Sequence, residues 1–424
     1  MNRTRNALIN QRIEKISCQH AVVGIDIAKD KHVAQVTDFR NRVLTPRAFT
    51  FSNSGEGFLR FQRWLEDVQA KHHLPAVLIG MEPTGHYWFN LANWLLEQSM
   101  EVVLVNPVLT HRNKENRDNS PSKNDSKDAL TIADLVNRGL YTEYVPQPEA
   151  FEQLKTVMSN REFWSEELTR YSNRIVRWID QYFPEFRKVF PDWTVPRALA
   201  SLRAFPLPVD LKDLTADEVI EQWRKQGMKR CGGPTGKAKA VELLRAAAQS
   251  IGHRRAWDEA RRDLQWLLGM YEQTLARMEE SGHAIEALLR ELPQAKPLQS
   301  MGLGMIAQAA LLGFGGDLSR YQHGRQLLRR AGLNLAECTS GTFKGKIKIS
   351  KRGDRALRKH LYLAMLQLVR HHADFRRWHE RNLQKGMSKQ KSIFKLMGKL
   401  ARMVVGMVRK GEMYRPGEQS QMAA

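Results

Sequence analysis

Four acidic residues near the start of the chain have the types and positions of a site for phosphoryl transfer. Asp26 interrupts the apolar run AVVGIDIA, where a carboxylate has little structural use. Glu82 follows the apolar run AVLIGM and precedes the turn sequence PTG, which would leave it at the edge of a sheet. Asp125 and Asp128 are three residues apart and would project from one face of a helix. Each acid alone could be structural, but the four together predict a shared site.

Carboxylates that converge repel one another unless cations hold them. Hard divalent ions with oxygen ligands, Mg²⁺ or Mn²⁺, suit such a donor set. Two ions about 3.5–4 Å apart can stabilise both the attacking and the leaving oxygen of a phosphodiester. The sequence therefore predicts metal-dependent chemistry on a phosphodiester, with Asp26, Glu82, Asp125 and Asp128 as metal ligands and catalytic residues.

The elements around these acids follow the order of a ribonuclease-H-like sheet. Strand patterns cover residues 21–28, 32–38, 42–51, 76–81 and 101–105, and helical patterns follow Asn53 and cover residues 86–98 and 126–138. In this fold the first strand, the fourth strand and the last helix converge, which would bring the four acids together. Actin-like sugar kinases begin with the same order, but no glycine-rich adenosine loop follows here, which disfavours a kinase.

The middle of the chain, residues 149–295, changes to two long helical stripes separated by an insertion at about 185–250. Apolar residues recur at three- and four-residue intervals from Leu154 to Tyr182 and again from Leu264 to Leu289. Such seams predict a coiled coil, within one chain or between two. The aromatic residues in these stripes are interpreted as packing residues.

The charge of the chain is concentrated near its C-terminus. Residues 20–145 contain 14 Lys or Arg and 15 Asp or Glu, whereas residues 340–424 contain 21 and 5, a net charge of +16. A polyanionic partner, DNA or RNA, matches this asymmetry, because cations at phosphates release condensed counterions. A solubilising surface is the alternative. No apolar run approaches the roughly 18 residues of a membrane span, and with no secretion signal recognised we expect a cytoplasmic, nucleoid-associated protein.

The C-terminal region also contains candidate contacts for a phosphate backbone. Gly302 and Gly304 precede an apolar helix and resemble half of a helix-hairpin-helix, in which glycine amides approach a phosphate. A basic run follows, in which the predicted nucleic-acid contacts are Lys344, Lys346, Lys348, Lys351, Arg352, Arg355 and Arg358. A solvated basic surface is the competing interpretation for each of them. The later basic helix, residues 389–410, is a further candidate surface.

Several motifs together resemble one known family. GIDIAK, MEPTG and KNDSKDA resemble the DEDD signature of the IS110 family of insertion-sequence transposases and of Piv-type DNA invertases. In the C-terminal region GLG, AGL, TSG and ISKRGDRALR look like the second conserved domain of that family. The sequence departs from the usual pattern at Met301, where the hairpin often has proline, and at Asn334-Leu335, where a proline commonly follows.

The resemblance implies a RuvC-like catalytic domain and a separate transposase domain with a catalytic serine. It further implies a composite active site in which that serine attacks DNA and forms a covalent phosphoserine intermediate. Family members are also implied to use a noncoding bridge RNA and to assemble as dimers that pair into tetramers. Ser340, which precedes Gly341, is the first candidate for this serine; Ser350 is the second and Thr339 the third.

We therefore expect an α/β domain followed by helical domains. The expected parts are a basic tail (1–19), a RuvC-like domain (20–148), a coiled-coil region (149–295) and a mostly helical, basic transposase domain (296–424). The predicted function is DNA transposition or site-specific recombination. A RuvC-like nuclease that uses water, with no serine chemistry, and a non-enzymatic nucleic-acid-binding regulator are the alternatives.

Overall fold

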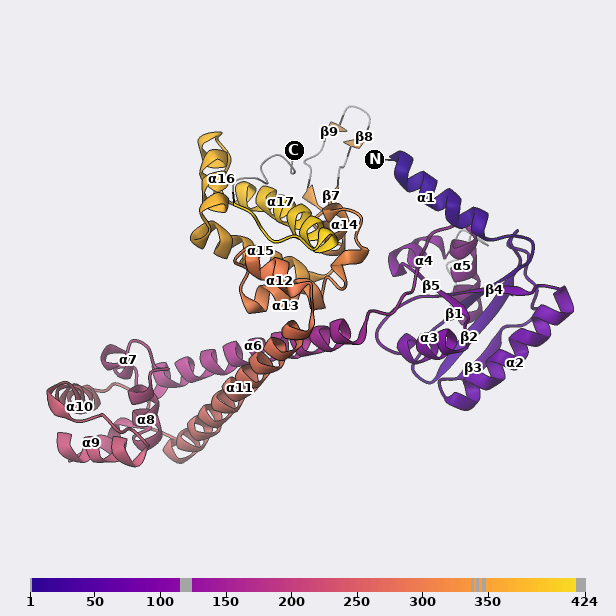
Figure 1. Ribbon diagram of the computed structural model, residues 1–424. Helices are drawn as coiled ribbons and strands as arrows, with labels where there is room; N and C mark the ends of the chain where they lie inside the picture. Colours follow the sequence, from indigo (N-terminus) through magenta and orange to yellow (C-terminus); the bar gives the residue numbers. More distant parts are fainter. Residues whose placement is uncertain (1, 115–123, 337–338, 341–342, 345–347, 417–424) are drawn as a thin grey trace. The chain divides into compact units, whose positions relative to one another are not determined.

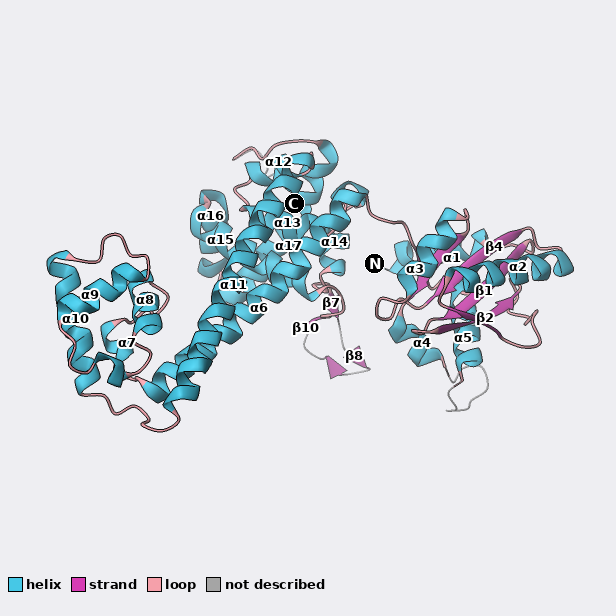
Figure 2. Cartoon of the chain, turned by 90° about the horizontal axis from the view of Figure 1, so that it is seen from below, coloured by secondary structure: helices cyan, strands magenta, loops and turns pink. Residues whose placement is uncertain are grey.

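The computed structural model describes residues 2–114, 124–336, 339–340, 343–344 and 348–416 (Figure 1). The chain divides into two compact units, Met1–Pro146 and Gln147–Ala424. The first is a mixed α/β unit and the second is almost entirely helical (Figure 2). Within the described part of the chain, no helix is long and apolar enough to span a membrane.

The first unit is built on a six-stranded sheet with the order β3-β2-β1-β4-β5-β6. Strands β1, β2 and β3 form an antiparallel meander, β4 and β5 run parallel to β1, and β6 is an antiparallel edge strand. The strands are β1 (His20–Asp26), β2 (Lys31–Thr37), β3 (Phe49–Ser52), β4 (Ala76–Met81), β5 (Glu101–Val105) and β6 (Tyr141–Glu143). This is the predicted order, except that the third strand is shorter than expected and β6 was not foreseen.

Helices cover both faces of this sheet, because its central strands alternate apolar side chains between two cores. On one face Val23 and Ile25 pack with α2 and α3. On the other face Val22 and Leu78 pack with α5. The helices of the unit are α1 (Asn2–Lys15), α2 (Gly55–His72), α3 (Trp88–Glu97), α4 (Pro107–Asn113) and α5 (Asp125–Asn137).

The segment expected to be a basic tail is instead a helix that belongs to this unit. The carbonyl of Ile9 lies so near Gly139 that a Cβ there would be 2.8 Å from it. The Lys15 ammonium pairs with Glu101 at 2.8 Å and with Glu143 at 3.5 Å. Ile16, which follows the helix, is buried. Local sequence did not reveal these contacts, because all of them join α1 to residues far along the chain.

In the second unit the two predicted helical stripes pair with each other within the chain. They form α6 (Glu149–Tyr182) and α11 (Trp257–Glu291), which lie side by side (Figure 1). Their ends belong to two different cores. Leu154 of α6 packs with the C-terminal helices, whereas Trp178 packs with the segment between the two long helices. Residues 149–295 are therefore shared between two cores.

Residues 183–256 form a small helical domain around the second of these cores, which we call the inserted domain. Its elements are α7 (Phe186–Val189), α8 (Pro196–Ala204), η1 (Pro208–Leu211), α9 (Ala216–Lys225) and α10 (Gly233–Ala248). The indole of Trp223 is fully buried and donates a hydrogen bond to Ser201 Oγ at 2.8 Å. This segment thus folds around its own hydrophobic centre at the joined ends of α6 and α11.

The C-terminal helices form the largest core of the unit. They are α12 (Ala295–Ser300), α13 (Met305–Gly313), η2 (Leu318–Arg320), α14 (Gly324–Arg330), α15 (Arg355–His371), α16 (Ala373–Gln384) and α17 (Lys389–Lys410). The basic helix α17 lies within this core, where Leu396, Leu400 and Val404 are buried. Two short antiparallel ladders, β7 (Leu335–Ala336) with β10 (Lys348–Ile349) and β8 (Thr339–Ser340) with β9 (Phe343–Lys344), extend between α14 and α15.

Candidate active site

Asp26 and Glu82 lie at the ends of two neighbouring parallel strands. β1 and β4 pair in a register that places Gly24 opposite Gly80. Continuing this register by two residues brings Asp26 beside Glu82. Side chains alternate between the two faces of a sheet, so both carboxylates lie on the face of these glycines, which α5 covers. The strand ends therefore present two acids to the first turn of that helix.

Helix α5 approaches the sheet closely because two strand positions lack side chains. A Cβ at Gly24 would lie 1.9 Å from the carbonyl oxygen of Ala129, and one at Gly80 would lie 2.4 Å from a methyl group of Val136. A larger residue at Gly24 would collide with the backbone of α5, and one at Gly80 would collide with the Val136 side chain of the same helix. Asp128 immediately precedes Ala129, so this contact fixes the acidic turn of α5 against the end of β1.

Hydrogen bonds fix both ends of α5. The side chain of Asn124 caps the helix by accepting from the Ser126 amide at 3.0 Å. The hydroxyl of Ser126 is hydrogen-bonded to the side-chain amide of Gln35 on β2 at 2.9 Å. At the other end the Asn137 side chain donates to Thr37 Oγ1 at 3.1 Å. The turn that contains Asp125 and Asp128 is thus held in place by β2 as well as β1.

The charges of the four acids act on one another. The pKa of Asp26 is raised to about 6, first by burial and then by the negative charges of Asp128, Asp125 and Glu82. The ammonium of Lys114 has the opposite but smaller effect. The structure therefore brings the four predicted acids into one electrostatic environment, while their catalytic role stays a prediction.

One cation of the chain already lies in this acidic cluster. The Lys114 ammonium is 2.7 Å from Oδ2 of Asp128, whose side chain is only 8% exposed. The other oxygen of Asp128, Oδ1, is buried and meets no hydrogen-bond donor among the described atoms. No three Asp, Glu, His or Cys side chains in the described ranges form a ready-made metal site. Sequence reasoning missed Lys114, because a lysine in a polar loop gives no signal that it will pair with an acid 14 residues away.

The C-terminal motifs AGL and ISKRGDRALR meet where two backbone segments cross. Gly332 has a positive φ of 66°. A Cβ at Gly353 would lie 2.4 Å from the Gly332 nitrogen and 2.3 Å from the carbonyl oxygen of Arg330. The Arg358 guanidinium closes the crossing by donating to the carbonyl of Ala331 at 2.7 Å. These motifs therefore form the base from which the β7–β10 ladder extends.

Ser340, the predicted nucleophile, lies in this extension. Its backbone pairs with Phe343 across the β8–β9 ladder. Its side chain lies outside the described residues, as do the side chains of Thr339 and Lys344 and the whole of Lys346. The role of Ser340 and the contacts predicted for these lysines therefore stay predictions from the sequence.

Two other serines have structural hydrogen bonds. The hydroxyl of Ser350, the second candidate nucleophile, donates to Asn334 Oδ1 at 2.7 Å and accepts from the Arg352 amide at 3.3 Å. Ser392 is hydrogen-bonded to His379 Nδ1 at 2.8 Å, but its side chain is fully buried in the C-terminal core. The core therefore closes off the Ser392 hydroxyl, whereas Ser350 is half-buried and its candidacy stays a prediction.

Four of the predicted phosphate contacts are exposed beside the glycine crossing. They are Lys348, Lys351, Arg352 and Arg355, and none forms an ion pair with a described residue. Arg358 differs from them, because its guanidinium is hydrogen-bonded to main-chain carbonyls at the base of the ladder. The four exposed side chains could bind an anion without first breaking an ion pair in the described part of the chain.

Gly302 and Gly304 lie in the turn between α12 and α13, as the hairpin interpretation predicts. Gly302 is exposed and has a φ of 82°, and Gly304 is the N-cap of α13. Met301, where the hairpin departs from the usual proline, is fully buried in the C-terminal core. The turn is thus anchored by Met301 and leaves the Gly302 backbone at the surface.

Two family models match the chain in the regions that carry these motifs. A model described as a transposase with the DEDD signature matches residues 23–184, and one described as the IS116/IS110/IS902 transposase family matches residues 296–380. Together they cover more than half of the chain. The chain belongs to the IS110 family of transposases. Residues 185–295 of this family member, which include most of the inserted domain, lie outside both matches.

Curated relatives agree with this assignment. The pilin gene-inverting protein of Moraxella lacunata is 28% identical over 153 residues, which are 36% of this chain and 45% of that protein. The IS117 mini-circle protein of Streptomyces coelicolor is 25% identical over 73% of this chain and 75% of its own length. An IS116 protein of Streptomyces clavuligerus is 23% identical over 81% and 83%. The match thus spans less than half of the pilin gene-inverting protein.

The raised pKa of Asp26 predicts how the stability of this IS110-family protein depends on pH without metal. The folded protein binds the Asp26 proton more tightly than the unfolded chain does, because the pKa of this carboxyl is near 3.8 in the unfolded chain. The free energy of unfolding should therefore fall as the pH rises from 3.8 through about 6. Asp26→Asn should remove this fall and stabilise the protein at neutral pH by about 1–2 kcal/mol, allowing for the partial exposure of the carboxyl.

Urea unfolding in EDTA, on both sides of this pH range, measures the effect. Asp67→Asn is a matched control, because Asp67 is exposed on α2 and belongs to the same unit. An Asp26→Asn protein whose stability has the pH dependence of the original protein would contradict the raised pKa of Asp26.

Proposed function

We propose that this protein is a DNA transposase or site-specific recombinase that cuts and rejoins strands of a mobile element. The observation that carries the proposal is the meeting of Asp26, Glu82, Asp125 and Asp128 on one face of the sheet. There burial and then the charges of the other three acids raise the pKa of Asp26. Membership of the IS110 family supports DNA as the substrate, and so does the basic C-terminal region.

These four carboxylates are proposed to hold Mg²⁺ or Mn²⁺. The donor set fits, because it consists of carboxylate oxygens that repel one another, and Oδ1 of Asp128 is buried without a hydrogen-bond donor among the described atoms. When bound, such an ion would stabilise negative charge on the phosphodiester and make a hydroxyl more acidic. Gly24 contributes by letting the acidic turn of α5 lie against β1, and Gly80 lets the other end of the helix lie close to β4.

Ser340 is proposed to be the nucleophile. Its Oγ would attack the phosphorus of the scissile phosphodiester, so that the Oγ–P bond forms while one P–O ester bond breaks. The leaving oxygen takes up a proton as the serine loses its own, and the DNA stays joined to the protein as a phosphoserine ester. Attack by a DNA hydroxyl on the same phosphorus would then release the serine and rejoin the strand. A serine hydroxyl is a weak nucleophile, so it needs a base or a bound metal ion to make it more reactive.

Two partners are proposed from the family resemblance. One is a noncoding bridge RNA that pairs with donor and target DNA, and the other is a second copy of the chain, with dimers pairing into tetramers. Exposed Lys348, Lys351, Arg352 and Arg355 are candidates for contacts with nucleic-acid phosphates. Because the acids and Ser340 lie in different units of the chain, a composite site could use residues of one copy or of two.

The test is strand cutting by the purified protein. The protein, the RNA that co-purifies from its host and labelled element-end DNA are incubated with Mg²⁺ or with EDTA. We expect cut strands and protein-linked DNA on a denaturing gel only when Mg²⁺ is present. Binding of the DNA with no metal-dependent cutting would instead identify a non-enzymatic regulator.

Lys114 provides a test of the metal site that does not depend on activity. Its ammonium pairs with Oδ2 of Asp128 at 2.7 Å, so a divalent ion that binds both oxygens of this carboxylate must displace it. Lys114→Met should therefore tighten Mn²⁺ binding about tenfold, because a charged hydrogen bond of roughly 1.5 kcal/mol no longer has to be broken. Isothermal titration calorimetry with Mn²⁺ measures the dissociation constant.

Lys71→Met removes an exposed ammonium from α2 and serves as the matched control. It should leave the Mn²⁺ dissociation constant unchanged. If Lys114→Met binds Mn²⁺ no more tightly than this control, then Lys114 does not compete with the ion at Asp128.

A further inference from the structure

A pocket of about 600 Å³ lies where the inserted domain meets the ends of the two long helices. Its walls come from the end of α6, from η1 and the turn after it, from the end of α10, and from the loop that leads into α11. The volume is within the roughly 300–1,000 Å³ of small-molecule sites. The pocket lies almost entirely outside the regions that the two family models match.

Aromatic rings and unpaired cations line this pocket together. Trp257, Tyr182 and His253 supply the rings, and the last two meet edge to face at 5.8 Å. Lys212 and Arg254 supply the cations; both are exposed, and neither forms an ion pair with any residue that the structure describes. Leu211, Leu214 and Leu244 add apolar wall, and Asp213 is the one acid among the lining residues. Flat apolar surface beside positive charge matches the base and the phosphate of a nucleotide.

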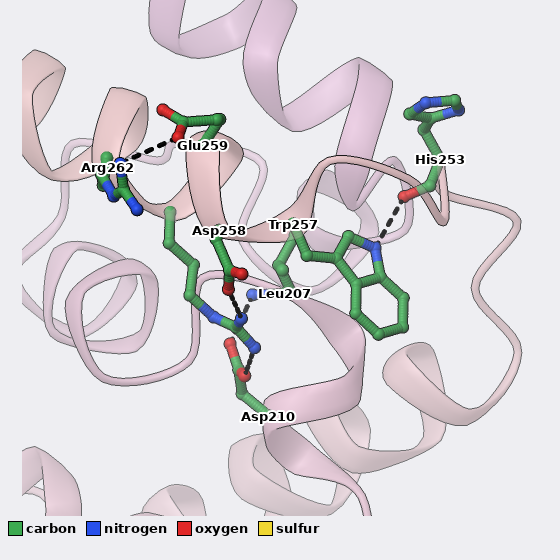
Figure 3. A network of polar contacts seen from close by, with 8 residues as sticks. Leu207, Asp210, His253, Trp257, Asp258, Glu259 and Arg262 are labelled. Atoms are coloured by element: carbon green, nitrogen blue, oxygen red, sulfur yellow. Dashed lines mark hydrogen bonds and ion pairs between the residues drawn. The ribbon is translucent and has the colours of Figure 1, made fainter.

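Close contacts fix the loop that carries His253 against the end of α6. A Cβ at Gly252 would lie 2.0 Å from the Tyr182 carbonyl oxygen, and the His253 amide donates to Gln181 at 2.9 Å. The Trp257 indole donates to the His253 carbonyl at 3.1 Å, as Figure 3 shows. A ligand of this pocket therefore meets rings that are already in place, which lowers the entropic cost of binding.

Polar contacts join the pocket wall of η1 to the first turn of α11. Arg261 pairs with Asp210 at 2.5 Å and with Asp258 at 3.4 Å. The Asp210 carboxylate also accepts from the Leu207 amide at 2.9 Å (Figure 3). These contacts hold η1 against the helix that begins with Trp257, so the two sides of the pocket keep a fixed separation.

The surroundings of the pocket favour a polyanionic strand over a free small molecule. Residues 183–256 contain 14 Lys or Arg and 8 Asp or Glu, a net charge of +6. Cations beside an aromatic pocket, here Lys212 and Arg254, are the combination that single-stranded nucleic acids need, because their bases are free to stack and their phosphates need cations. A base paired inside a duplex could not enter the pocket without leaving its stack.

We propose that this pocket binds one unpaired nucleotide of a single-stranded nucleic acid, with its base against Trp257 and Tyr182 and its phosphate near Lys212 and Arg254. The inference rests on the proposed function only in taking a nucleic acid as the partner. It concerns a site in the second unit, whereas the four acids lie in the first. The two proposals can therefore fail separately.

Fluorescence anisotropy of labelled 12-nucleotide strands with the full chain tests the proposal. Single-stranded RNA and DNA of equal sequence, a hairpin duplex and a nucleoside monophosphate competitor are the arms. Trp257→Ala should weaken binding of the single strands about tenfold, which is the usual effect of removing one stacking partner, and should leave duplex binding unchanged. Trp266→Ala, which removes an indole that is 50% exposed on the same helix outside the pocket, is the matched control.

Comparison of the RNA and DNA strands shows which of the two the pocket prefers. Strong competition by the nucleoside monophosphate would overturn the proposal that the ligand is a strand. Trp257→Phe keeps a stacking ring and should bind as the original protein does. Lys212→Ala and Arg254→Ala change exposed residues and leave the core intact. If the residue contacts a phosphate, each substitution should make the fall of log binding constant with log salt concentration less steep by about 0.7.

Photocrosslinking locates the contact directly. A strand with one 5-iodouridine should crosslink to the peptide that contains residues 252–257, and Trp257→Ala should abolish this crosslink. Crosslinks only to other parts of the chain, with single-strand affinity unchanged in Trp257→Ala and in Lys212→Ala, would overturn the proposal. Metal-dependent strand cutting would still be expected in that case, because the acidic site does not depend on the pocket.

Discussion

Asp26→Asn is expected to reduce strand cutting by about a thousandfold while the protein folds normally and still binds DNA. The substitution keeps the shape of the side chain and removes its negative charge at the point where three other carboxylates act on it. If the acids hold metal ions, the lost stabilisation of transition-state charge is about 4 kcal/mol, which corresponds to about three orders of magnitude in rate. The rate of cutting of labelled element-end DNA in Mg²⁺ measures this effect.

Asp67→Asn is again the control for a lost carboxylate in the same unit, and it should cut at the original rate. DNA affinity, measured by gel shift in EDTA, should be the same for both variants. Cutting by Asp26→Asn at the rate of this control would exclude Asp26 from the chemistry. The proposed role of the four acids as metal ligands for strand cutting would then be wrong.

Activity and stability are expected to respond to Asp26 in opposite directions. Without metal, the carboxylate is disfavoured by burial and by its three acidic neighbours, so asparagine should stabilise the fold. A cluster of carboxylates that is only partly compensated reduces the stability of the protein that contains it and is usually retained for function. Lys114 neutralises part of this charge. Its side chain is 30% exposed, so the ammonium is free to move away when another cation binds.

The sequence predicted the part of the fold that positions the acids, because that part is specified locally. Continuous apolar runs indicated β1 and β4, and the helix pattern after Asn124 indicated α5. Gly24 and Gly80 were visible as residues, but their purpose was not. The structure shows that the backbone of α5 takes the place of a side chain at Gly24, and that the Val136 side chain of α5 does so at Gly80.

Features that depend on distant contacts were not predictable in the same way. The basic residues of α1 suggested a tail, whereas Lys15 pairs with Glu101 and Glu143 across the unit. From the sequence, the segment at about 185–250 is interpreted as an interruption because it is rich in proline and glycine. The pocket at its edge joins Tyr182 to Trp257, which are far apart in sequence and become neighbours only because α6 and α11 pair.

Ser340→Ala is expected to abolish the covalent protein–DNA adduct completely. If Ser340 Oγ forms the phosphoserine ester, alanine leaves no atom at that position to bond to phosphorus, so both the adduct and strand rejoining should disappear. A denaturing gel of reactions with end-labelled DNA, with and without protease, separates protein-linked DNA from free cut strands. Thr339 is the neighbouring hydroxyl, and Thr339→Val should leave the adduct in place.

Ser350→Ala is the informative control, because it removes a serine hydroxyl from the same basic region. That hydroxyl is bonded to Asn334 at 2.7 Å, so its loss should cost some stability and leave the adduct intact. The result that distinguishes recombinase from nuclease is the behaviour of Ser340→Ala in Mg²⁺. Undiminished cutting without an adduct would mean that water is the nucleophile, and the acidic site would then belong to a RuvC-like nuclease. Loss of cutting together with the adduct would make the four acids and one serine parts of a single reaction.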